Sequence, residues 1–274
     1  MRLLRFQGPG TAGPRLGLEE EEGGDVVDLS EAEPALPRSM RAFLESGEHG
    51  LQAARRALAS GRHRLLRAGV RLLAPIDDPE KVICVGLNYR DHCLEQDVKV
   101  PKEPLIFSKF PSAITGPFDD IVHPAESSEV DWEVELAAII GKAGRHIQES
   151  AALEHIVGFT VANDVSARDW QMRRNGRQWL LGKTFDTFCP LGPAIVTKDS
   201  VTARRRGAVR DRGTGHYLQQ GGVRTRPPPQ TPPCLAMTVL NKSAPGDGRC
   251  SLCADFIALQ GQWLQLHELL EEGS

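Results

Sequence analysis

The sequence predicts an α+β fold, mostly β, in three consecutive parts that comprise residues 1–75, 76–201 and 202–274. Three observations lead to this expectation. Short apolar runs divided by Gly and Pro recur up to about residue 201, which is typical of strands. Helical spacing of apolar residues is clearest between residues 40 and 60. From Thr202 neither periodicity persists, so the last part is expected to be largely disordered.

The first part, residues 1–75, is expected to be a small α/β module without catalytic residues. Its strand candidates are residues 2–6, 16–18 and 26–29. Ser39 is a suitable N-cap for a helix over Met40–Glu45, and a second helix should stop at Gly61. Residues 75–79 contain two prolines and are expected to link this module to the next part.

The second part begins with an apolar strand, Lys81–Gly86, and a helix candidate that contains His92 and Glu95. Their i, i+3 spacing places both side chains on one helix face, where Glu95 can orient the imidazole and raise its basicity. Such a pair suits a general base, although the same pattern is ordinary on surface helices. A strand over residues 103–107 leads to Lys109, which either pairs with a substrate carboxylate or is solvated.

An acidic stretch follows at residues 129–136. Its acids are Glu129, Asp131, Glu133 and Glu135, and apolar residues stand between them. Because side chains alternate along a strand, an extended chain places the four carboxylates on one face. Like charges this close repel. One interpretation is a half-buried strand with its acidic face in water; the other is a site for a hard divalent cation.

Asp164 favours the cation site. Residues 156–162 are apolar enough for a buried strand, and Asp164 comes directly after it, where Ser166 could cap the next helix. A lone Asp at this point is more often a turn residue. Together with Glu133 and Glu135, however, it completes three carboxylates that can hold Mg²⁺, with Mn²⁺ or Ca²⁺ as alternatives.

Basic and amide side chains follow this candidate site. Arg168 and Gln171 precede a basic loop at residues 173–177, which would suit an anionic substrate or simply face solvent. Lys183 follows a short apolar segment, and residues 185–188 are expected to form a strand with a turn at Cys189 and Pro190.

Three motifs in this order resemble the fumarylacetoacetate hydrolase family: "VDWEVELAAIIGK", "NDVSARDWQ" and "LLGKTFDTFCPLGP". The resemblance covers residues 2–201 and implies a fumarylacetoacetase-type mixed β-barrel or roll and a homodimer in mitochondria. The cytoplasm is the alternative location. It also implies that His92 is the general base and Glu95 its carboxylate partner. Gln171 and Lys183 would hold substrate oxygens and stabilise an enolate.

The chemistry that the resemblance implies is enol–keto tautomerisation of oxaloacetate. A cation chelated by two adjacent substrate oxygens stabilises the enolate. The alternatives are hydrolysis of a C–C bond in acylpyruvate-type 1,3-dicarbonyls and decarboxylation of oxaloacetate. Because the family's remaining strands and a Thr-Gly-Thr-Pro-type loop are not recognised after residue 201, we expect an incomplete catalytic domain. A non-catalytic partner of a complete homologue is therefore a further hypothesis.

Composition excludes other classes of partner. The net charge of −3 provides no basic field for nucleic acid, and we expect no membrane span because no apolar run approaches ~20 residues. The six cysteines lack the spacing of a disulfide-rich scaffold. The Arg- and Pro-rich sequence of residues 204–233 favours disorder. An RNA-binding tail built on the Arg cluster at 204–212 is disfavoured, because no aromatic residue accompanies that cluster before Tyr217.

Overall fold

The computed structural model of the chain describes residues 1–88, 93, 97–201 and 236–241, the last stretch as backbone only. The predicted general base His92 and its partner Glu95 lie outside the described residues, as does most of the tail expected to be disordered. No described helix has the length and apolar character of a transmembrane helix.

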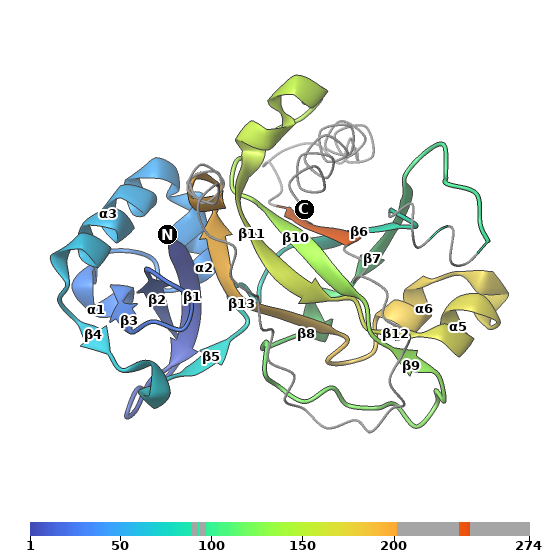
Figure 1. Cartoon of the computed structure of the whole chain (residues 1–274), viewed down its shortest axis with the longest axis horizontal. Coiled ribbons are helices and arrows are strands. Elements are labelled where there is room, and N and C mark those ends of the chain that lie inside the picture. Colours follow the sequence, from blue (N-terminus) through green and yellow to red (C-terminus); the bar gives the residue numbers. More distant parts are fainter. Residues whose placement is uncertain (89–92, 94–96, 202–235, 242–274) are drawn as a thin grey trace, which may run out of the picture.

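A twelve-stranded sheet runs through the molecule, with strand order β4-β3-β2-β1-β13-β11-β10-β14-β6-β7 (Figure 1). In addition, β5 pairs with β1, β8 pairs with β13, and β9 and β12 form a separate two-stranded sheet. The strands are β1 Arg2–Gln7, β2 Arg15–Glu19, β3 Val26–Asp28, β4 Arg64–Leu65, β5 Arg71–Leu73, β6 Lys81–Gly86, β7 Leu105–Lys109, β8 Ile114–Thr115, β9 Val130–Asp131, β10 Val134–Ile140, β11 Ile156–Asn163, β12 Ser166–Ala167, β13 Cys189–Thr197 and β14 Ala236–Asn241.

Helices are few and short, which agrees with the predicted α+β, mostly β class. Those beside the N-terminal strands are α1 Leu29–Ala32, α2 Met40–Glu45 and α3 Gly47–Ser60, with the 3₁₀ turn η1 Arg67–Gly69. Those of the larger part are α5 Arg168–Met172 and α6 Leu180–Lys183, with 3₁₀ turns η2 Pro111–Ala113, η3 Glu149–His155 and η4 Asn175–Arg177.

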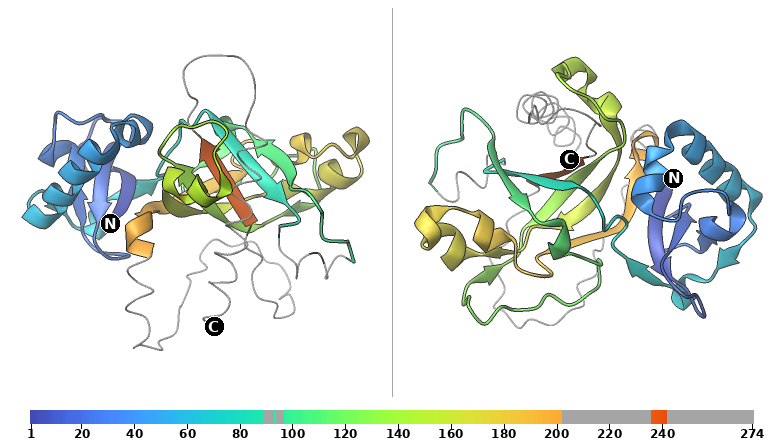
Figure 2. Two further views of the ribbon diagram at one scale, coloured as in Figure 1. Left: turned by 90° about the horizontal axis from the view of Figure 1, so that it is seen from above. Right: turned by 180° about the vertical axis from the view of Figure 1, so that it is seen from behind.

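The N-terminal elements confirm the predicted caps. The Ser39 hydroxyl accepts a hydrogen bond from the Ala42 amide at 3.1 Å, as an N-cap serine does. Gly61 ends α3 in the left-handed region, with φ of 66°, which a glycine adopts without strain. These elements form one lobe beside the larger part (Figure 2).

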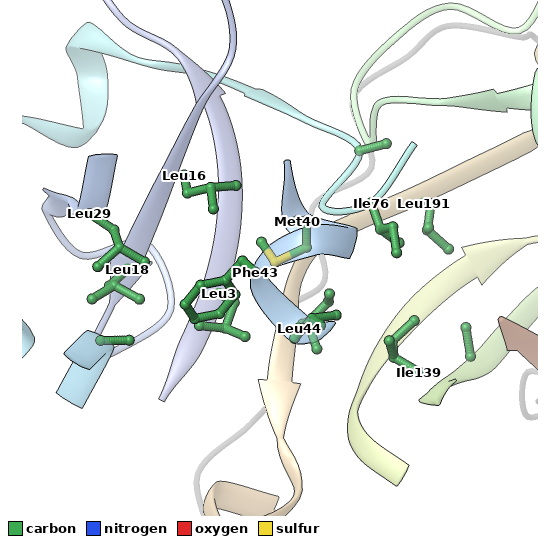
Figure 3. Close-up of a cluster of buried hydrophobic side chains, with 14 of the residues drawn as sticks. Leu3, Leu16, Leu18, Leu29, Met40, Phe43, Leu44, Ile76, Ile139 and Leu191 are labelled. Atoms are coloured by element: carbon green, nitrogen blue, oxygen red, sulfur yellow. The ribbon is translucent and has the colours of Figure 1, made fainter. Parts of the chain in front are cut away.

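The two lobes share one sheet and one core. Strand β1 pairs antiparallel with β13 through Arg2↔Val196 and Leu3↔Ile195. Met40 and Leu44 of α2 stand between the leucines of the N-terminal strands and a group on the other side that includes Ile139 (Figure 3). The N-terminal module is therefore continuous with the part that carries the acidic stretch.

The structure corrects four expectations of local structure. The acidic stretch is not one strand: β9 pairs with β12, β10 pairs with β11, and residues 132–133 lie between the two sheets. Ser166 lies in β12 rather than capping α5, and its hydroxyl donates to the Asp164 carbonyl at 2.9 Å. Residues 185–188 form a turn, and the strand begins at Cys189. Within the stretch expected to be disordered, β14 pairs parallel with β10 and antiparallel with β6.

Candidate metal centre

The pairing of β10 with β11 brings the two parts of the acidic site together. In the antiparallel register Glu135 lies opposite Ala162, and Val134 lies opposite Asn163. Just beyond the ladder, the Asp164 amide donates to the Glu133 carbonyl at 2.7 Å. As a result, Glu133, Glu135 and Asp164 each offer one carboxylate oxygen, and these oxygens lie within 4.8 Å of one another.

Two of the three carboxylates are removed from solvent. Glu135 is 3% exposed and Asp164 is 2% exposed. Burial raises the pKa of Glu135 well above its ordinary value, and the neighbouring carboxylates of Asp164 and Glu133 raise it further. Burial acts in the same sense on Asp164, but two lysines outweigh it and lower the pKa of that carboxyl group. The negative charge of Asp164 is therefore balanced by lysines, whereas burial and repulsion dominate at Glu135.

The two lysines are Lys109 and Lys183. The Lys109 ammonium group lies 2.7 Å from Asp164 Oδ1, and that of Lys183 lies 2.8 Å from Asp164 Oδ2. Lys183 also reaches Glu133 Oε2 at 3.1 Å. Although burial lowers the pKa of Lys183, the charges of Asp164 and Glu133 dominate and raise it, so this side chain remains a cation.

Arg168 is the third cation, and it starts α5 directly after β12. Its guanidinium pairs with Glu133 and, at 2.7 Å, with Asp131 Oδ2, and it donates to the Gln171 amide oxygen at 2.9 Å. Gln171 is itself 3% exposed. Two of the predicted substrate-binding residues are thus linked to each other and to Glu133.

The residues present fit a hard divalent cation. The donor set consists of carboxylate oxygens, which Mg²⁺, Mn²⁺ and Ca²⁺ prefer. Glu135 Oε2 is buried and has no hydrogen-bond partner among the residues that the structure describes, which is the situation that a cation would relieve. Glu133 and Asp164 would share their oxygens between that cation and the neighbouring ammonium and guanidinium groups.

Aromatic side chains surround Lys183. Its ammonium group lies 4.8 Å from the ring centre of Phe107 and 6.0 Å from that of Trp179, and the two rings meet edge to face at 5.5 Å. Trp179 fits because Gly86 ends β6: a Cβ atom there would lie 2.5 Å from the indole Cζ3. A groove of about 810 Å³ runs along β7 and includes Phe107, Lys109 and Trp179 in its lining.

The structure thus brings most of the predicted site residues together. Glu133, Glu135 and Asp164 converge, and their cationic neighbours are Lys109, Arg168 and Lys183. No pattern in the sequence indicated the aromatic pair of Phe107 and Trp179. The sequence could have indicated the packing of Trp179 only through Gly86, a glycine at the end of a strand, where a close approach is common.

Comparisons with known proteins give concordant results. The family model described as "Fumarylacetoacetate (FAA) hydrolase C-terminal" matches residues 81–225. Over 223 residues, 81% of this chain, the sequence is 61% identical to the mitochondrial oxaloacetate tautomerase FAHD2A of Bos taurus and 59% identical to that of Homo sapiens, and it covers 71% of each relative.

A solved structure shows the same fold. The fumarylacetoacetate hydrolase of Exiguobacterium antarcticum is 39% identical and superposes with a TM-score of 0.60, over 73% of this chain and 67% of that one. The region matched by the family model, residues 81–225, begins at β6 and includes all three carboxylates.

Proposed function

This chain belongs to the fumarylacetoacetate hydrolase family, and on that premise we propose that it is a Mg²⁺-dependent oxaloacetate tautomerase. The observation that carries the proposal is the convergence of Glu133, Glu135 and Asp164 within 4.8 Å. The names of the relatives support oxaloacetate as the substrate. Arg168 and Lys183, the cationic side chains that reach Glu133, favour a small dicarboxylate, because their positive charges attract the negative charges of such a substrate.

Glu133, Glu135 and Asp164 would hold the cation. When bound, Mg²⁺ supplies Lewis-acid stabilisation to the oxygens of the enolate. Lys183 is placed to donate a hydrogen bond to an enolate or carboxylate oxygen, since its ammonium group already bridges two of the acids. Arg168 and Gln171 orient the other end of the dicarboxylate, and Phe107 and Trp179 exclude water on the far side of Lys183.

Tautomerisation also needs a group that moves a proton between oxygen and carbon: in the enol-to-keto direction the enol oxygen loses a proton and the neighbouring carbon gains one. We assign this role to His92, with Glu95 as the residue that orients its ring, on the basis of their spacing in the sequence. Lys109 has no role at the reacting atoms in this mechanism.

The assay follows the loss of enol-oxaloacetate absorbance in excess EDTA and after readdition of Mg²⁺. We expect accelerated ketonisation only with the metal, and its loss in Glu135→Gln. The matched control is Glu129→Gln, which removes an acid from the same stretch, where it pairs with Arg173 on the surface. Equal rates for wild type and Glu135→Gln would contradict the proposal.

A second candidate reaction is hydrolysis of a C–C bond, because a solved relative at 39% identity is named a hydrolase. Acylpyruvate cleavage and CO₂ release from oxaloacetate are therefore measured on the same preparations. Acylpyruvate cleavage faster than ketonisation would assign the chain as a hydrolase, and CO₂ release would assign it as a decarboxylase. Mg²⁺ binding without any turnover would identify a non-catalytic partner of a complete homologue.

The relatives' names also guide location and assembly. We propose that the protein acts in mitochondria, as the relatives are named mitochondrial proteins. We further propose a homodimer, which light scattering coupled to size-exclusion chromatography would detect as twice the mass of 30.0 kDa. Elution at the mass of one chain would refute it.

A further inference from the structure

Lys109 occupies an unusual position at the end of β7. Its side chain is 0% exposed, although an ammonium group is rarely buried so completely. The last residue of an edge strand would ordinarily reach solvent, and the sequence analysis accordingly considered solvent or a substrate carboxylate as its partner. The structure instead directs this side chain inward, toward the loop that carries Asp164.

The Lys109 ammonium group is surrounded by oxygen atoms of the protein. The Lys109 ammonium group lies 2.7 Å from Asp164 Oδ1, and it donates to the carbonyl oxygens of Val165 at 2.9 Å and Lys183 at 2.6 Å. An ammonium group has three donors and no acceptor. Two of these donors are used by backbone carbonyl oxygens, and the charge is balanced by the ion pair with Asp164, so the side chain is engaged with the protein.

The three partners belong to the segments that build the metal centre. Asp164 and Val165 form the exit of β11, and Lys183 is the last residue of α6. Lys109 therefore connects β7 to both segments. It holds one oxygen of Asp164 while Lys183 holds the other, so the carboxylate plane is fixed from two sides.

We propose that Lys109 is a positioning residue: it orients Asp164 toward the cation and fixes the backbone from which Lys183 extends, and it does not contact substrate. This inference rests on the proposed function, because it concerns how well the centre holds Mg²⁺. Partners that orient metal ligands typically contribute about 10–100-fold to metal affinity or activity.

The test replaces Lys109 by Met, which keeps the length of the side chain and removes the charge and the donors. Calorimetric titration with Mg²⁺ should show affinity weakened about 10–100-fold, and kinetics at saturating Mg²⁺ should show a lower kcat with an unchanged KM for oxaloacetate. A residue that binds substrate would instead raise KM and leave the Mg²⁺ affinity as it was, and this result would overturn the proposal. Lys102→Met, at an exposed lysine of the same region, is the matched control.

A measurement on the wild-type protein covers the case in which the variant does not fold. Native protein is acetylated with and without oxalate and analysed by peptide mass spectrometry. We expect full labelling of Lys102 and none of Lys109 in both samples; labelling of Lys109 that oxalate prevents would refute the positioning role. If wild type neither binds Mg²⁺ nor accelerates ketonisation, the proposed function fails, whereas the labelling pattern still tests where Lys109 points.

Discussion

Replacing Glu135 by Gln should stabilise the metal-free protein and abolish its stabilisation by metal. Glu135 is 3% exposed, and its Oε2 atom has no hydrogen-bond partner among the described residues. Its pKa is raised mainly by burial and further by the negative charges of Asp164 and Glu133. A buried polar group without a partner costs about 1–3 kcal/mol. Glutamine has the same shape without the charge that Asp164 and Glu133 repel, and its amide N–H groups can donate to those carboxylates, so the variant should recover free energy of about this size.

The expected change is large enough for a thermal scan. For a chain of this size, 1 kcal/mol shifts Tm by about 2–4 °C, so the variant should melt roughly 2–12 °C above wild type in EDTA. At a Mg²⁺ concentration of 100 times Kd, wild type should gain about 2.7 kcal/mol of unfolding free energy. The variant should gain little of this, and the order of the two melting temperatures should approach equality or reverse.

The assay is differential scanning fluorimetry in EDTA and across a Mg²⁺ series, with Glu129→Gln as the surface control. A variant that melts below wild type in EDTA and is stabilised by Mg²⁺ to the same extent would refute the reasoning. Such a result would mean that Glu135 is satisfied by the protein itself and contributes nothing to cation binding.

Four further outcomes follow from the packing. Gly86→Ala should lose about 1–3 kcal/mol of unfolding free energy in urea titrations, because its Cβ would lie 2.5 Å from the Trp179 ring; Gly13→Ala, with nothing within 4 Å, should not. Burial raises the pKa of the Cys189 thiol to about 12, so iodoacetamide at pH 8 should modify it only in urea, as mass spectrometry would show. Because the unfolded thiol ionises near 9.0, this group should lower stability as pH rises above that value. Glu19→Gln breaks a buried ion pair with the arginine opposite it on β1 and should lower the free energy of unfolding by about 3–5 kcal/mol; a change below 1 kcal/mol would show that the pair is dispensable.

The convergence of the acids could be predicted because it depends on local patterns. Glu135 lies in β10 and Glu133 comes just before that strand, two residues away, and a strand that ends at Asn163 presents Asp164 next to them once β10 and β11 pair. The caps at Ser39 and Gly61 are local in the same way.

What the sequence could not predict depends on the order of strands in the sheet. Lys109 reaches Asp164 because β7 and β6 connect to β10 through β14, a strand for which the sequence offered no periodicity. The break in the acidic stretch at residues 132–133 also has a tertiary cause, since β9 pairs with β12 and β10 with β11. The alternating pattern alone therefore joined residues 129–136 into one strand.

The ladder between β1 and β13 has a consequence for biosynthesis. Leu3 leaves the ribosome long before its partner Ile195, and at elongation rates of about 5–20 residues per second the interval is about 10–40 s. During that time the beginning of β1 is an unpaired edge on the nascent chain, and such edges recruit other extended segments. Translation speed and chaperone occupancy should therefore influence the yield of this protein more than that of one whose first strand finds partners for both of its edges nearby in the sequence.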